Sequence, residues 1–185
     1  TGNKVRVLDV GSKNWNYVYG LCQYLKYAAE GQGRELELSG IEIDAYGIYS
    51  DFYSRHDYAQ AYVKQARAQK DKIEYLAGDF LETAYRDLDV VTLFFPFVLE
   101  EALTSWGLPK RHFEPLKLLQ NALDALKPNG LMIITSQTRN EAQQLNVDLT
   151  NLAGEIVFQE PLRLKLVHYW PQTSERVLSL VKKNG

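Results

Sequence analysis

Acidic residues stand at the ends of three apolar runs in this sequence. Asp9 lies in "LDVGS" at residues 8–12, Glu42 follows "SGI", and Asp79 lies in "AGDF" at residues 77–80. A carboxylate has two oxygens, so Glu42 can accept hydrogen bonds from both hydroxyls of a ribose. Asp79 can accept from an adenine amino group, while the backbone of Phe80 reads the ring edge. Together these acids predict a site for an adenine nucleoside.

Two alternatives stay open for these acids. Asp44 is a rival to Glu42, and both carboxylates can be solvated loop charges. A glycine followed by an aspartate, as at residues 78–79, is also common in ordinary turns. We favour the ligand role for Glu42 because an acid at a strand end is typical of nucleotide-binding sheets.

The turn after the first apolar run has an unusual composition. Gly11 is followed by Ser12, Lys13, Asn14 and Trp15, where nucleotide-binding turns carry further glycines. Lys13 takes the place of the second glycine, and a side chain there costs space unless it points outward. A nicotinamide-binding turn needs the glycine-x-glycine spacing for close approach of the pyrophosphate, so the dinucleotide alternative ranks lower.

Strands and helices alternate along the chain and must position these residues. β-branched and apolar runs predict strands at 4–10, 36–43, 72–78, 88–95 and 131–136. Apolar spacing of three and four predicts helices at 18–29, 58–66, 116–126 and 140–152, with Asp57 as an N-cap. Runs at 161–170 and 175–183 flank "PQTS" and predict a terminal hairpin. The units imply a parallel sheet with helices on both faces and a ligand crevice at its carboxyl edge.

This layout resembles the class I S-adenosylmethionine-dependent methyltransferases over nearly the whole chain. The motifs "LDVGS", "GIEID" at 40–44, "AGDF" and "LKPNG" at 126–130 match that family in order. The resemblance implies one α/β domain over residues 1–185, with a doubly wound, mostly parallel seven-stranded sheet of order 3-2-1-4-5-7-6 and an antiparallel last strand. It also implies S-adenosylmethionine as cofactor. The residues expected to bind it are Asp9, Gly11, Ser12, Lys13, Asn14, Glu42, Ile43, Asp79, Phe80 and Phe95.

Composition excludes several classes of protein. The formal net charge of -2 over 185 residues gives no global attraction to nucleic acid or anionic membrane, and no basic stripe with interleaved aromatics is present. Cys22 is the single cysteine, which fits a reducing, cytoplasmic location. The three histidines have no spacing typical of a metal site. We expect a segment upstream, because the chain begins almost inside its first strand without an initiator methionine.

Methyl transfer is an in-line displacement, so it needs a base only if the acceptor holds a proton. His112, in the long connection at 100–114, and Tyr46, in the tyrosine-rich stretch after the second strand, are the candidate catalytic residues. One of Tyr17, Tyr46 and Tyr49 is expected to touch the ligand. The run "LFFPFV" at 93–98 lacks the polar residue that many amino-group methyltransferases carry there, which disfavours methylation of DNA adenine or protein glutamine.

The sequence therefore predicts a methyltransferase acting on a small-molecule acceptor. A second hypothesis is a non-catalytic binding or interaction protein of the same fold, suggested by Lys13, Asn14 and Trp15 in the altered turn. A third is transfer of another group, such as an aminopropyl group, which would call for a cluster of acids around the site, and Glu100 and Glu101 do not amount to one. All three hypotheses share the same fold, so the fold alone does not distinguish them.

Overall fold

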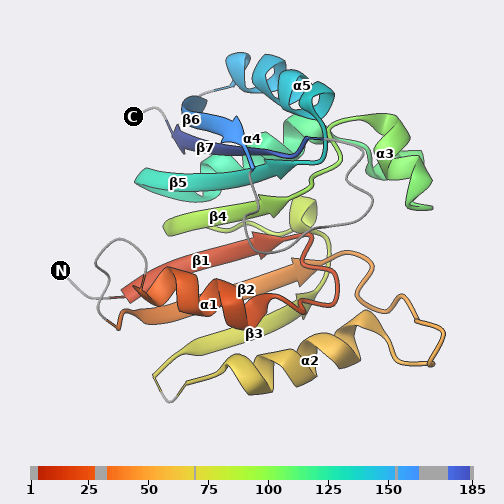
Figure 1. Cartoon of the computed structure of the whole chain (residues 1–185), viewed down its shortest axis with the longest axis vertical. Coiled ribbons are helices and arrows are strands. Elements are labelled where there is room, and N and C mark those ends of the chain that lie inside the picture. Colours follow the sequence, from red (N-terminus) through yellow and green to blue (C-terminus); the bar gives the residue numbers. More distant parts are fainter. Residues whose placement is uncertain (1–3, 28–32, 69, 153, 163–174, 184–185) are drawn as a thin grey trace. The chain divides into compact units, whose positions relative to one another are not determined.

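The structure is a computed structural model that describes residues 4–27, 33–68, 70–152, 154–162 and 175–183 (Figure 1). Two compact units, residues 1–92 and 93–185, are described separately below. The strands are β1 (Lys4–Val10), β2 (Glu35–Glu42), β3 (Lys72–Ala77), β4 (Leu88–Phe94), β5 (Leu126–Ser136), β6 (Gly154–Pro161) and β7 (Val177–Lys183). The helices are α1 (Val18–Tyr27), α2 (Arg55–Ala66), α3 (Glu100–Ser105), α4 (Pro115–Ala125) and α5 (Arg139–Thr150), with 3-10 turns η1 (Phe80–Glu82) and η2 (Lys110–His112).

The strand order confirms the predicted fold class. The seven strands form one sheet of order β3-β2-β1-β4-β5-β7-β6, flanked by helices. The pairs of β7 with β5 and with β6 are antiparallel, whereas β1, β2 and β3 run parallel to one another. None of the helices in the described parts of the chain is long and apolar enough to cross a membrane.

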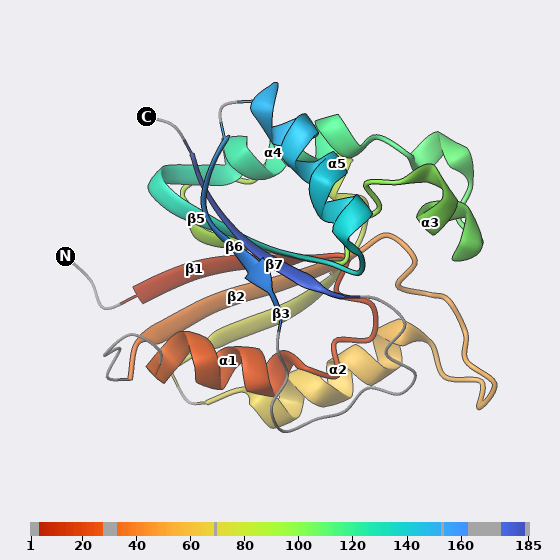
Figure 2. The ribbon, with the colours of Figure 1, turned by 45° about the horizontal axis from the view of Figure 1, so that its top comes forward.

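In the first unit, α1 and α2 cover the same face of β1, β2 and β3 (Figure 2). Strand register sets buried residues side by side on that face. Val7 lies beside Leu38, which lies beside Ile73, and all three are at most 2% exposed. The next such row towards the carboxyl ends consists of Asp9, Gly40 and Tyr75. This row carries the polar and small residues on which the candidate site is built.

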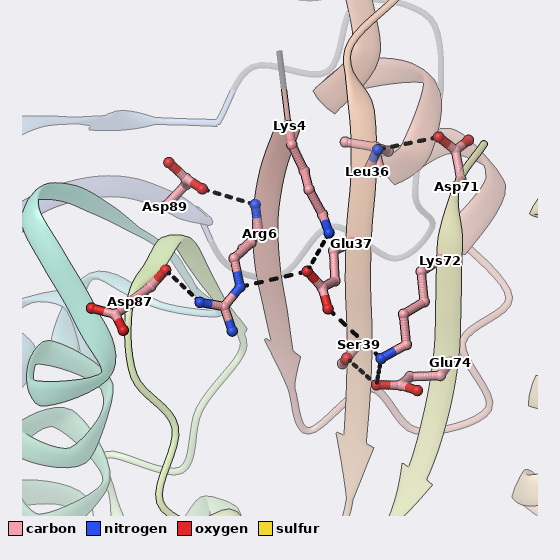
Figure 3. A network of polar contacts seen from close by, with 10 residues as sticks. All are labelled: Lys4, Arg6, Leu36, Glu37, Ser39, Asp71, Lys72, Glu74, Asp87 and Asp89. Atoms are coloured by element: carbon pink, nitrogen blue, oxygen red, sulfur yellow. Dashed lines mark hydrogen bonds and ion pairs between the residues drawn. The ribbon is translucent and has the colours of Figure 1, made fainter. Parts of the chain in front are cut away.

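The opposite face of these three strands is polar near their beginnings (Figure 3), whereas Leu8 and Ile41 further along it are buried. The carboxylate of Glu37 forms ion pairs with Lys4 at 2.9 Å, with Arg6 at 3.6 Å and with Lys72 at 3.7 Å. Glu74 continues the network through Lys72, and its carboxylate accepts from Ser39. Parallel sheets are usually apolar on both faces because helices cover both. Here mutual pairing keeps the charged side chains compatible with water.

The connection from β3 to β4 explains that polar face. The sequence suggested a repeating strand-helix unit, yet only the short η1 turn separates the two strands. Asp79 caps η1, its Oδ1 accepting from the N–H of Leu81 at 2.8 Å. Too few residues are available between β3 and β4 to form a helix that crosses the face.

The N-cap of α2 is a different residue from the one predicted. Ser54, not Asp57, is the N-cap: its hydroxyl accepts from the N–H of Asp57, whose carboxylate accepts from the N–H of Ser54. Asp57 is thus the third residue of a capping box. The predicted N-cap was wrong because either polar residue can begin a helix, and the reciprocal pair uses both.

The second unit holds the end of the sheet and two of the longer helices. Strand β5 begins at Leu126, five residues before the predicted start, and passes through Asn129 with a φ of 64°. Strand β6 occupies 154–161, earlier than the predicted 161–170, most of which lies outside the described residues. The predicted antiparallel pairing is confirmed, because Pro161 lies beside Val177 in register.

Candidate functional site

The two predicted strand-end acids follow neighbouring strands of the first unit. Glu42 is the last residue of β2 and lies beside Ala77, the last residue of β3. The backbone N–H of Gly78 continues the pairing by donating to the carbonyl of Glu42 at 3.0 Å. Ile43 and Asp79 therefore leave adjacent strands at the same edge. Sequence reasoning predicted this proximity from the parallel arrangement alone.

Glu42 is 7% exposed and already holds two backbone groups. Its Oε2 accepts from the N–H of Lys13 at 2.7 Å, and its Oε1 accepts from the N–H of Asp44 at 2.9 Å. An ionised carboxylate has about four lone-pair positions, so two of them remain for a ligand. Glu42 is thus both a clamp on the turn and an acceptor fixed in one orientation.

Ile43 and Asp79 present complementary surfaces beside Glu42. The Ile43 side chain is 40% exposed, which is high for an apolar residue at a strand end. Asp79 uses Oδ1 to cap η1, and within the described residues its Oδ2 accepts no hydrogen bond. Phe80 is buried and stacks on Tyr85 with ring centroids 5.9 Å apart. The Phe80 side chain therefore belongs to the core, and only its backbone can serve a ligand.

The turn from Gly11 to Trp15 has positive φ angles typical of a glycine-rich turn, although Gly11 is its single glycine. Gly11, Lys13 and Trp15 have φ angles of 74°, 54° and 56°. This left-handed region is uncommon for residues other than glycine, so tertiary contacts must hold Lys13 and Trp15 there. Gly11 donates to the carbonyl of Ile41 at 2.9 Å, and the carbonyl of Lys13 accepts from the hydroxyl of Tyr75.

Trp15 is the contact that organises the turn. Its side chain is fully buried and lies over Gly40, where an added Cβ would come within 2.7 Å of the indole. The indole Nε1 donates to Asp9, on one side of Gly40, and the ring lies 6.0 Å from that of Tyr75, on the other. Gly40 therefore provides the recess that accepts Trp15.

Asp9 is a buried acceptor for three donors. Its Oδ2 accepts from Trp15 at 2.8 Å and from the hydroxyl of Tyr17 at 2.6 Å, and its Oδ1 accepts from Thr92. Burial raises the pKa of Asp9 from 3.8 to about 6, although the three hydrogen bonds lower it and the charge of Glu42 raises it slightly. Burial also raises the pKa of Tyr17. Being fully buried, Asp9 shapes the turn from beneath.

The remaining turn residues divide between surface and interior. Gly11 is exposed, and Lys13 and Asn14 are half-buried. Ser12 is fully buried, and its Oγ has no hydrogen-bond partner among the residues that the structure describes. Lys13 thus occupies the position expected for a second glycine and still has a φ of the kind that glycine adopts. The lysine side chain therefore does not force the backbone of the turn into another conformation.

The candidate residues outside the turn lie as follows. Tyr46 is 69% exposed in the loop after β2, with its ring 5.5 Å from that of His56. Tyr49 is packed on Tyr58 at 5.5 Å. These aromatic residues belong to the first unit, where they contact other rings.

Phe95 and His112 belong to the second unit. Phe95 has a φ of 59°, donates its N–H to the carbonyl of Thr135 at 2.9 Å, and lies 5.1 Å below the guanidinium of Arg176. His112 ends η2 and is half-buried, with its Nε2 3.3 Å from Nε of Arg111. In the described ranges, no group of three His, Cys, Asp or Glu side chains could hold a metal.

Sequence reasoning missed the residues that support the turn. Gly40, Tyr75 and Thr92 lie on β2, β3 and β4, and nothing in their local sequence indicates a contact with residues 9–17. The available signal was the register: once β1, β2 and β3 are aligned, Asp9, Gly40 and Tyr75 form one row. A glycine in mid-strand often marks the close approach of another group, here the indole of Trp15.

Comparison with solved structures identifies the architecture. The chain aligns over 99% of its length with 76% of the [4+2]-cyclase SpnF, at 13% identity and a TM-score of 0.68. It aligns over 98% of its length with 82% of a SAM-dependent methyltransferase from Aquifex aeolicus, at 14% identity and a TM-score of 0.63. The chain has the class I methyltransferase fold.

A third example of the class I methyltransferase fold is the N-methyltransferase NodS from Bradyrhizobium japonicum. The alignment covers 98% of this chain and 86% of NodS, at 13% identity and a TM-score of 0.61. No protein-family model and no curated protein matches the chain. At such low identity the likeness establishes the class I methyltransferase fold and leaves activity to be argued from the site.

Proposed function

We propose that the chain is an S-adenosylmethionine-dependent methyltransferase that acts on a small-molecule acceptor. The observation that carries this proposal is the adjacency of the two strand-end acids: Gly78 joins β3 to the carbonyl of Glu42, so Asp79 follows on the neighbouring strand. The solved structures of the same fold include S-adenosylmethionine-dependent methyltransferases, which supports this cofactor class.

The adenosine portion of the cofactor fits the residues at this edge. Glu42 has lone pairs left for the two ribose hydroxyls, and its orientation is fixed by two backbone N–H groups. Ile43 offers an exposed apolar surface for the adenine ring. Asp79 retains Oδ2 for the exocyclic amino group. Preorganised acceptors of this kind reduce the entropy lost when a ligand binds.

The amino-acid portion of the cofactor would lie over the turn. Gly11 is exposed with a φ of 74°, and Lys13 adopts the φ that a second glycine would adopt. Trp15 is buried beneath the turn and takes no space above it. When bound, S-adenosylmethionine supplies a methyl group on a positively charged sulfur, so the protein contributes mainly alignment and the exclusion of water.

Calorimetric titration with S-adenosylmethionine and with S-adenosylhomocysteine tests the proposal. We expect micromolar dissociation constants for both compounds, followed by methyl transfer in a screen of small-molecule acceptors. Absence of binding at millimolar concentration would refute the cofactor assignment. Binding without turnover on any acceptor would favour the interaction protein that Lys13 and Trp15 suggested.

A further inference from the structure

A pocket of about 610 Å³ in the second unit is lined by residues at the beginnings of α3 and α5 and by Glu175. Volumes of this order accommodate small organic ligands. Leu99 and Ala102 give the pocket an apolar side, and neither is fully exposed. Three glutamates line the rest of it together with Thr138, Arg139 and Asn140, so the pocket combines an apolar surface with negative charge.

The charges around the pocket do not balance. Glu101, Glu141 and Glu175 line it together with one cation, Arg139. Nε of Arg139 pairs with the carboxylate of Glu175, and this pair neutralises itself. In the part of the chain that the structure describes, Glu101 and Glu141 form no ion pair. Among the residues that line the pocket, these two acids therefore have no paired cation, although Lys110, which pairs with Glu100, also feels the charge of Glu101.

Glu141 is the more informative of these two acids. It is only 7% exposed, although it lies in the first turn of α5. Its Oε2 accepts from the backbone N–H of Gln137 at 2.6 Å, whereas Oε1 accepts no hydrogen bond from any described residue. A buried carboxylate is costly unless a cation or a full set of donors compensates it. Oε1 of Glu141 is not among the buried polar atoms without a partner, so it is open on the pocket side and can accept from a ligand that brings a positive donor.

We propose that this pocket binds an organic amine in its ammonium form. The ammonium donates to Oε1 of Glu141 and lies within the field of Glu101, while the carbon skeleton packs on Leu99 and Ala102. An ammonium supplies three donors and no acceptor, which matches a wall of carboxylates. That the amine is the methyl acceptor rests on the proposed function, whereas its binding does not.

Calorimetry on the full chain at low ionic strength tests the pocket directly, with hexylamine, hexan-1-ol and hexanoate as probes. We expect hexylamine to bind at least tenfold more tightly than the alcohol of equal length, and hexanoate not to bind. Affinity for hexylamine should fall as salt screens the charges. Equal affinity for the amine and the alcohol would overturn the proposal, because apolar contact alone would then explain binding.

Variants locate the interaction within the pocket. Glu141→Gln keeps an acceptor for the N–H of Gln137 and removes the charge, so hexylamine should bind at least tenfold more weakly. Glu155→Gln alters an exposed acid of β6 outside the pocket and should leave affinity unchanged. An equal loss in both variants, or none in Glu141→Gln, would refute the site. The latter result would mean that the amino terminus of α5 alone compensates Glu141.

A second substitution keeps the test decisive if Glu141→Gln does not fold. Glu101 is exposed on α3, so Glu101→Lys is compatible with folding and places a cation in the pocket. It should abolish hexylamine binding and admit hexanoate, and unchanged preference for the amine would contradict the proposal. Titration with S-adenosylmethionine in the same preparations separates the two proposals, because either ligand can bind when the other fails.

Discussion

The indole Nε1–H of Trp15 donates a hydrogen bond of 2.8 Å to Oδ2 of Asp9, within the fully buried interior of the first unit. This bond fastens the turn to the strand from which it emerges. Nucleotide-binding turns of parallel sheets ordinarily use several glycines to obtain their path. Here a single buried aromatic residue, its acceptor and one mid-strand glycine support a turn in which Lys13 and Trp15 have positive φ angles.

Gly40→Ala should destabilise the protein because the new Cβ would come within 2.7 Å of the Trp15 indole. Overpacking of this kind costs about 1–3 kcal/mol of unfolding free energy. Trp15→Phe shortens the side chain, so Gly40→Ala should cost at least about 1 kcal/mol less in that background. Urea unfolding of the four proteins gives the coupling, and strictly additive effects would contradict the packing described here.

Gly20→Ala is the matched control for that cycle. Gly20 is exposed on α1, and nothing lies within 4 Å of the position of its Cβ. Alanine favours helices over glycine by about 0.5–1 kcal/mol, so this variant should be slightly more stable than the original protein. Its effect should not depend on whether residue 15 is Trp or Phe.

The buried carboxyl of Asp9 should make stability depend on pH. Its pKa is raised from 3.8 to about 6 by burial, so between these pH values the folded protein holds a proton that the unfolded chain releases. Unfolding free energy therefore falls as pH rises from about 4 to about 6. One pKa unit corresponds to about 1.4 kcal/mol, so this contribution approaches 3 kcal/mol.

Asp9→Asn removes that titration, and the comparison isolates it from other groups. The unfolding free energy of the original protein minus that of the variant should decrease by about 2 kcal/mol from pH 4 to pH 7. Urea unfolding at each pH measures the difference. A difference that stays constant over this range would show that Asp9 titrates normally.

Lys13 should accept glycine more readily than alanine because its φ is 54°. A left-handed conformation costs residues with a Cβ about 1–2 kcal/mol, so Lys13→Gly should be about 1 kcal/mol more stable to urea than Lys13→Ala. Asn14 provides the control, because it is absent from the residues of positive φ. There the alanine variant should be at least as stable as the glycine variant, and the opposite order would contradict the assignment of strain to Lys13.

Glu42→Ala should weaken S-adenosylmethionine binding at least tenfold if Glu42 holds the ribose, because charge-assisted hydrogen bonds contribute about 1.5–3 kcal/mol. The change also removes the acceptor of the Lys13 and Asp44 N–H groups, so unfolding must be measured in parallel. Glu82→Ala alters an exposed acid of η1 and serves as control. Unchanged cofactor affinity in a folded Glu42→Ala protein would exclude the ribose contact.

The fold was predictable from the sequence because each element has a local signal. Apolar runs of β-branched residues indicated β1 to β5, and glycines and prolines marked their ends. Asp57 and Ser54 show where local signals become ambiguous, since two polar residues competed for one capping role. The absent helix between β3 and β4 was less visible, because a short connection carries no pattern of its own.

The candidate site was predictable only in part. Glu42 and Asp79 could be placed together because parallel strands bring their ends to one edge. The function of Trp15 could not be inferred, because it depends on the recess at Gly40 and on Asp9 beneath it. Such contacts depend on how neighbouring strands align, and a single sequence does not reveal that alignment.

The charge network around Glu37 also has a consequence for protein design. The beginnings of β1, β2 and β3 carry paired lysine, arginine and glutamate on the face that α1 and α2 do not cover, where a covering helix would require apolar side chains. A designer who wishes to shorten a larger scaffold of this type could delete the helix after the third strand. Residues at the positions of Arg6, Glu37 and Lys72 would then be the ones to replace first.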